Sequence, residues 1–117
     1  MSKLTDPEKL ACFKNALANW RYEGFIILTE VAFDWIRIHL PTLSPRSLGR
    51  LMHESVLGGN EIDQQKETRP EWSVHDFHYD LRFAIDGRLV YIETRLIYDD
   101  PDDPDNPIIH VVNIHEA

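Results

Sequence analysis

The stretch from Phe77 to Leu96 decides the fold, and it reads FHYDLRFAIDGRLVYIETRL. Up to Ile85, large apolar residues alternate with mostly polar ones, which is the period of a half-buried β-strand. Asp86-Gly87 is the preferred residue pair of a two-residue type I′ turn. A return strand then runs from Leu89 to Tyr98. The stretch therefore predicts an antiparallel β-hairpin.

A two-residue turn also fixes which residues lie opposite each other in the hairpin. On one face we expect Phe83 opposite Val90 and Leu81 opposite Ile92, so this face is apolar and should pack on helices. The other face is polar. Its expected members are His78, Asp80, Arg82, Tyr91, Glu93 and Arg95.

Three helices are predicted before the hairpin, each from a capping residue at its start. Asp6-Pro7 begins the first, whose apolar stripe continues to Trp20 before Gly24. Thr29 caps the second, which Pro41 stops. Ser44-Pro45 begins the third, which ends at Gly58-Gly59. The inner face of the second helix is expected to hold Ala32, Trp35, Ile36, His39 and Leu40.

Further strands complete the predicted sheet. Residues 108–115 are apolar on both faces and are expected inside the sheet. Residues 61–69 suggest a polar edge strand, and residues 25–28 are either a strand or an extended link. The prediction is a single α+β domain, 1–117. Two or three N-terminal helices (residues 1–59) pack on one face of a three- to four-stranded antiparallel sheet (residues 60–117).

Composition limits the function classes. The chain has 117 residues and a net charge of −8, with 43% hydrophobic residues. These values are typical of one globular domain, and no apolar run is long enough to cross a bilayer. One cysteine excludes an internal disulfide framework, so we expect a cytoplasmic protein without membrane association. The acidity excludes a basic protein that binds nucleic acid unspecifically, because phosphate contacts need Lys and Arg.

The polar face of the hairpin is the first candidate site. Glu93 or His78 can act as a general base, two arginines can bind phosphate, and Tyr91 can position or stack on a nucleobase. Metal-free RNA cleavage needs such a set. The candidate catalytic residues are therefore His78, Arg82, Tyr91, Glu93 and Arg95. The alternative is a solvated sheet face on which opposite charges stabilise the hairpin.

A second candidate lies on the third helix. Arg46, Arg50 and His53 share one side of it, where they either bind nucleic-acid phosphates or form a solvated surface. No metal site or other cofactor is predicted. The five aspartates of residues 99–105 lack the spacing of an EF-hand, and His75 and His78 would project from opposite faces of a strand. Cys12 is expected to be a core residue.

The order of these elements is similar to a known group of small bacterial domains. Residues 25–28 lead into Thr29-Glu30-Val31-Ala32 at a helix start, the hairpin follows Gly58-Gly59, and residues 108–114 close the chain. Over residues 25–115 this order resembles the RelE and BrnT toxin type. The resemblance implies a small antiparallel sheet with helices on one face. It also implies metal-independent mRNA cleavage and neutralisation by a partner antitoxin.

Two functional hypotheses follow. In the first, the chain is a toxin-like RNA-cleaving domain with RNA and an antitoxin-like protein as partners. In the second, it is a non-catalytic interaction or regulatory module that uses the polar sheet face or the acidic loop, residues 99–105. A homodimer is compatible with either hypothesis.

Overall fold

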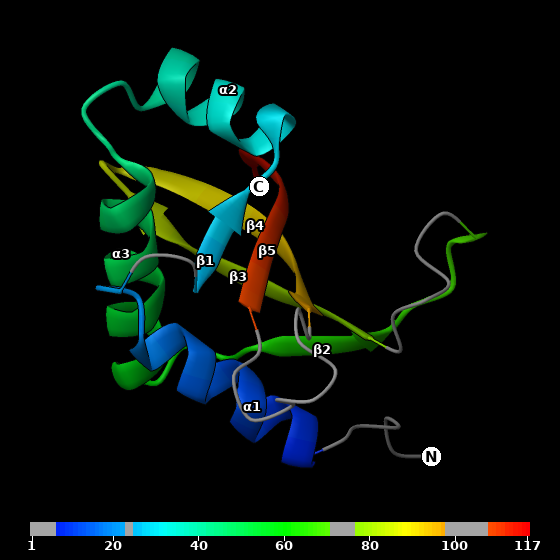
Figure 1. The fold of residues 1–117 in the computed structure, drawn as a ribbon. Coiled ribbons are helices and arrows are strands. Elements are labelled where there is room, and N and C mark those ends of the chain that lie inside the picture. Colours follow the sequence, from blue (N-terminus) through cyan, green and yellow to red (C-terminus); the bar gives the residue numbers. More distant parts are fainter. Residues whose placement is uncertain (1–6, 23–24, 71–76, 98–107) are drawn as a thin grey trace.

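The computed structural model describes residues 7–22, 25–70, 77–97 and 108–117. In this part of the chain it contains three helices and one five-stranded sheet (Figure 1). In chain order the elements are α1 (Pro7–Ala18), β1 (Ile26–Leu28), α2 (Glu30–His39), α3 (Pro45–Leu57), β2 (Asp63–Lys66), β3 (Phe77–Ile85), β4 (Arg88–Ile97) and β5 (Ile108–Glu116). The predicted α+β class is confirmed.

The hairpin β3–β4 has the predicted register. Its pairs run from Tyr79 opposite Thr94 to Ile85 opposite Arg88. Asp86 and Gly87 both have positive φ, 51° and 80°, as a type I′ turn requires. Because side chains alternate between the two faces, this register places the apolar set on one side and the polar set on the other.

The sheet itself differs from the prediction of three or four antiparallel strands. Its order is β1-β5-β4-β3-β2, and β1 runs parallel to β5, so the sheet is mixed and has five strands. The three residues of β1 are too few to show the alternating pattern of a strand. No turn indicates that β5 is its parallel partner, because the connection between them spans the chain from Leu28 to Ile108. β5 is internal, as predicted, and β2 is an edge strand, shorter than residues 61–69.

Helix starts agree better with the sequence than helix ends do. α1 begins at Pro7, and α2 and α3 have the predicted caps, Thr29 and Ser44. α1 ends at Ala18, not beyond Trp20, because the chain leaves the helix in a turn in which the Trp20 N–H donates to Leu17 O. His39 was predicted to face inward and is exposed instead, with its ring 4.7 Å from that of Trp35.

The helices cover the apolar face of the sheet. Phe13 of α1 stacks on Tyr79 of β3 at 4.9 Å, and Leu48 and Met52 of α3 are fully buried in the same core. α3 approaches β1 at Gly49, where an added Cβ would lie 2.7 Å from Ile26 Cδ1. Among the described residues, no helix is long and apolar enough to cross a membrane. The other face of the sheet carries the polar side chains.

Candidate functional site on the polar sheet face

Asp80 is the centre of the polar sheet face. It lies on β3 and is only 3% exposed, although it faces away from the helices. Its carboxylate accepts a hydrogen bond from the Tyr91 hydroxyl and contacts His78 Nδ1 at 2.9 Å. A buried carboxylate needs such partners, because desolvation of the charge is costly. We call Asp80, His78 and Tyr91 the Asp80 cluster.

The Tyr91 ring is enclosed by two further side chains. Arg82 and His115 flank Tyr91 on the neighbouring strands β3 and β5. The His115 ring stacks on the Tyr91 ring at 4.9 Å, and the Arg82 guanidinium lies 5.6 Å from its centroid. Stacking and cation–π contacts of this kind hold the aromatic ring in place. Tyr91 therefore presents its hydroxyl to Asp80 in a fixed orientation.

The electrostatic environment of the cluster is negative. Burial raises the pKa of Asp80, and its hydrogen bonds from Tyr91 and His78 offset this only in part. Burial and the hydrogen bond to Asp80 raise the pKa of the Tyr91 hydroxyl well above its usual value. The charges of Asp80, Glu93 and Asp63 raise it further. A pKa raised by several carboxylates indicates a place that favours an added positive charge.

An open depression of about 340 Å³ lies beside the Asp80 cluster. Three carboxylate residues line it, Glu61, Asp63 and Asp80, together with Arg82, Tyr91, Asn60 and Leu81. We call this feature the acidic depression. Asn60 closes it at one side, where its side-chain amide donates to Arg82 O at 3.0 Å. The acidic depression is open to solvent, whereas Asp80, one of the residues that line it, is mostly covered.

The other end of the polar face is a buried ion network. Arg95 is 0% exposed, and its Nη2 lies 2.8 Å from Glu67 Oε2 and 2.9 Å from Glu93 Oε2. Arg69 bridges the same two carboxylates, 3.0 Å from Glu67 and 2.5 Å from Glu93. Two arginines and two glutamates thus neutralise one another. The network fixes the segment after β2 against the sheet.

These contacts keep both glutamates ionised. Burial alone would raise the pKa of Glu67, but the hydrogen bonds and charges of Arg69 and Arg95 outweigh it, so its pKa lies below the usual value. For Glu93, too, the effect of burial is outweighed by the hydrogen bonds and charges of Arg69 and Arg95, which lower its pKa. A paired carboxylate of lowered pKa is a weak proton acceptor at neutral pH. Glu93 is therefore poorly suited to act as a general base.

The structure divides the five predicted catalytic residues into two groups. His78, Arg82 and Tyr91 meet around Asp80. Glu93 and Arg95 belong to the ion network, in which the Arg95 side chain is inaccessible. A phosphate could contact Arg82 but not Arg95 without rearrangement. The sequence pattern could not separate these groups, because all five residues alternate correctly on one face.

The sequence analysis predicted no site role for several residues of the polar face. Asp80 was assigned to the polar face but not to the site, and Glu61, Asp63, Glu67 and His115 were given no role. One signal was available for three of them. Glu61, Asp63 and Glu67 alternate with other residues along the predicted edge strand, so they are expected on one face of it.

The second predicted site lies elsewhere. Arg46 and Arg50 are exposed on α3, and Arg50 Nε is 3.8 Å from Glu54 Oε1. Leu48 and Met52 of the same helix pack in the core on the helical side of the sheet. Arg46, Arg50 and His53 therefore do not join the polar sheet face. Nothing in their contacts distinguishes them from a solvated helix surface.

Possible metal ligands are scattered over the described residues. In that part of the chain no three His, Cys, Asp or Glu side chains are grouped to hold a metal ion. The aspartates of residues 99–105 and His75 lie outside the described residues. Cys12 is a half-buried free thiol packed against the core.

The chain was also compared with known proteins. No family model, no curated protein and no solved structure matches it.

Proposed function

We propose that this protein is a non-catalytic binding module and that its acidic depression receives a basic side chain of a protein partner. One observation carries the proposal: three carboxylate residues line the depression against a single guanidinium, that of Arg82. Complementary charges on two proteins speed their association and favour the correct partner over others. A lysine or arginine side chain fits this electrostatic environment, whereas a phosphate would meet repulsion from Glu61, Asp63 and Asp80.

The rigidity of the surroundings supports the same proposal. The Tyr91 ring is held between Arg82 and His115, and the ion network restrains the segment that follows β2. A preorganised surface loses less conformational entropy when a partner binds. Tyr and Arg are also the residue types that most often contribute binding energy at protein interfaces.

The proposal predicts that Asp63→Asn weakens binding of a short arginine–glycine peptide by about tenfold, because one attractive charge is lost. Fluorescence anisotropy of the labelled peptide measures this affinity. Added salt should weaken binding to the unsubstituted protein as well. Glu54→Gln, which removes an exposed carboxylate on α3, is the matched control and should leave the affinity unchanged. Equal losses in both variants, or equal binding of an aspartate–glycine peptide, would contradict the proposal.

Metal-independent RNA cleavage is a second candidate, and the contact between His78 and Asp80 favours it. A carboxylate that orients an imidazole can assist a general base. In this reaction the 2′-oxygen would attack phosphorus as its proton passes to His78, and the bond to the 5′-oxygen would break as that oxygen takes a proton from water. Purified protein with chelator should then cut RNA to 2′,3′-cyclic phosphate ends, and His78→Ala should abolish cutting. RNA that stays intact would exclude this candidate.

A further inference from the structure

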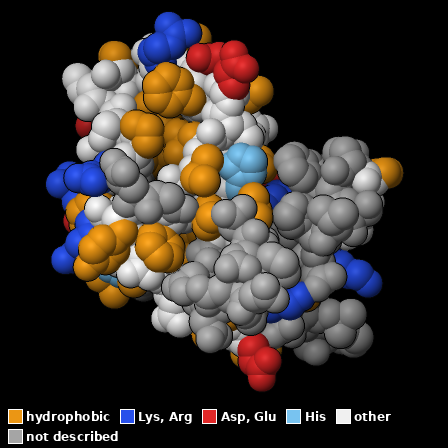
Figure 2. Space-filling model, in the orientation of Figure 1, with side chains coloured by type: hydrophobic (Ala, Val, Ile, Leu, Met, Phe, Trp, Pro, Cys, Tyr) orange, Lys and Arg blue, Asp and Glu red, His pale blue; other side chains and the backbone are white. Residues whose placement is uncertain are grey.

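α2 exposes apolar side chains that the core does not use. Val31 is 63% exposed, Ile38 64% and Phe33 45%, and Ile27 on the preceding strand β1 is 44% exposed. Figure 2 shows hydrophobic side chains gathered over α2 and β1 on the face of the molecule that it presents. Exposed apolar residues grouped in this way are typical of an interaction surface.

Two of these side chains, Val31 and Ile38, form a line along α2 together with Trp35. Val31 and Ile38 are seven residues apart, which is about two helical turns, so they project from the same side. Trp35 lies between them and is half-buried, whereas Ala32 and Ile36 point into the core. We call Val31, Trp35 and Ile38 the α2 stripe. It is a short version of the seam by which two helices pack against each other.

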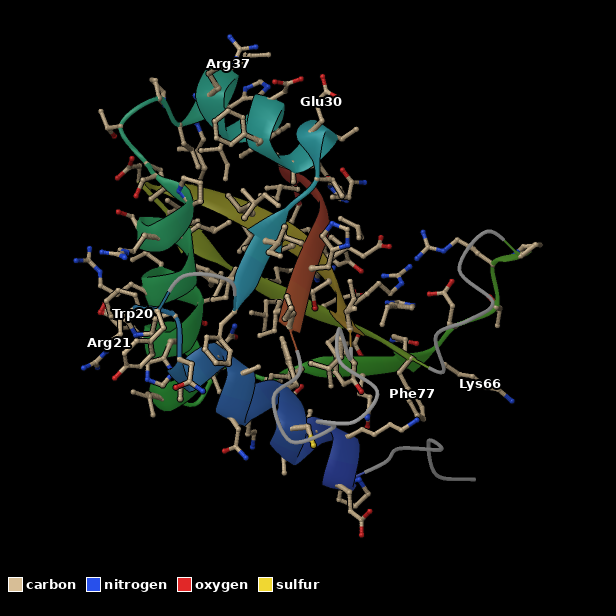
Figure 3. All side chains as sticks on the ribbon, viewed as in Figure 1. Trp20, Arg21, Glu30, Arg37, Lys66 and Phe77 are labelled. Atoms are coloured by element: carbon tan, nitrogen blue, oxygen red, sulfur yellow. The ribbon has the colours of Figure 1, made fainter. Side chains whose placement is uncertain are left out.

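The charges beside the α2 stripe identify its occupant. Glu30 and Asp34 lie in the N-terminal half of α2, and Arg37 lies in its last turn, with its Nη2 3.4 Å from Asp34 Oδ1 of the same helix. Glu30 and Arg37 extend from the helix away from the sheet (Figure 3). When two copies of such a helix pack antiparallel about a twofold axis, the same flanks meet and the acidic half of each faces the basic end of the other. The charge pattern is therefore complementary to itself.

We infer that two copies of this chain associate through the α2 stripe, with their α2 helices antiparallel. Val31 of each copy packs near Ile38 of the other, and Arg37, which pairs with Asp34 of its own helix, lies within reach of the other copy's Glu30. The inference does not depend on the proposed function. α2 packs on β5, whereas the carboxylates of the acidic depression lie on β2, on β3 and, for Glu61, just before β2. A dimer therefore leaves the depression open.

Sedimentation velocity of the full chain, measured over about a hundredfold range of protein concentration, tests this inference, because a dimer forms as the concentration rises. The protein should pass from monomer to dimer. Ile38→Lys should raise the dissociation constant at least about tenfold, because it places a charge against the apolar Val31 of the other copy. Leu57→Lys is the control, since Leu57 is 73% exposed on α3, outside the α2 stripe, and it should change the constant by less than about twofold.

A charge exchange provides a second test that does not alter the apolar residues. Arg37→Glu should weaken the dimer, and adding Glu30→Lys to it should restore most of the lost affinity, because opposite charges again meet across the twofold axis. Far-ultraviolet circular dichroism checks that each variant keeps its helices. A protein that stays monomeric at every concentration, or a dimer that Ile38→Lys leaves intact, would overturn the inference.

Discussion

Replacing Glu67 by glutamine should lower the free energy of unfolding by about 3–5 kcal/mol, because it removes one partner of a buried charge. The Glu67 side chain is 1% exposed and lies within ion-pair distance of both Arg69 and Arg95. Without its carboxylate, the fully buried Arg95 would share Glu93 with Arg69. Such a loss is a large fraction of the stability of a small domain.

Urea unfolding followed by tryptophan fluorescence measures this change. Glu54→Gln is the matched control, since it removes a glutamate whose ion pair with Arg50 is exposed, and it should cost less than about 0.5 kcal/mol. The pKa of Glu67 is lowered in the folded state, so its stabilisation is present above its unfolded pKa and is lost as the pH falls through the folded value. A cost for Glu67→Gln no larger than that of the control would show that the network is dispensable.

Asp80→Asn should have the opposite effect and stabilise the protein at neutral pH. The folded-state pKa of Asp80 is raised by burial. The contribution of Asp80 to stability is therefore fully present below its unfolded pKa and is lost as the pH rises through the folded value. Asparagine resembles the neutral carboxyl group and can still accept a hydrogen bond. Each unit by which the pKa is raised corresponds to about 1.4 kcal/mol.

Thermal unfolding at a series of pH values checks the prediction for Asp80. The variant should have the higher Tm at neutral pH, and the two curves should converge in acid, where the wild-type carboxyl is protonated. Glu54→Gln, at an exposed position on α3, should give nearly parallel curves with no such divergence. A variant that is less stable than the wild type at neutral pH would mean that the ionised Asp80 holds the cluster together.

These two carboxylates illustrate different uses of a charge inside a protein. Glu67 is surrounded by arginines and stabilises the segment after β2. Asp80 is desolvated beside other carboxylates, so its charge costs stability where a neutral residue would not. A charge kept at such a cost is typical of functional sites. This contrast favours the Asp80 side of the polar face, not the ion network, as the proposed binding surface.

Local rules were sufficient to predict the hairpin and the helix starts. Asp86-Gly87 determines a turn type, the turn determines the register, and Thr29 and Ser44 satisfy free N–H groups at helix ends. β1 was harder because its partner β5 is distant in the chain and pairs with it in parallel. No turn connects them, and three apolar residues fit several structures.

The site was predictable only in part, for a related reason. Alternation places six polar side chains of the hairpin on one face, but it does not say which of them a third segment will bury. Residues 67–70 follow β2, and Glu67 and Arg69 pair with Arg95 and Glu93. That tertiary contact, invisible in the hairpin alone, separates the ion network from the Asp80 cluster. The sequence therefore predicts the polar sheet face, but not its separation into the ion network and the Asp80 cluster.

Chemical-shift mapping by nuclear magnetic resonance tests most directly whether the acidic depression binds a basic side chain. Titration with a short arginine–glycine peptide should produce saturable shifts at Glu61, Asp63 and Tyr91, while Arg46 and Arg50 on α3 stay unchanged. Asp63→Asn should reduce the shifts, and a short RNA at the same concentration should produce none in this region. Shifts that fail to saturate, or RNA that moves the same resonances instead, would contradict binding of a basic partner.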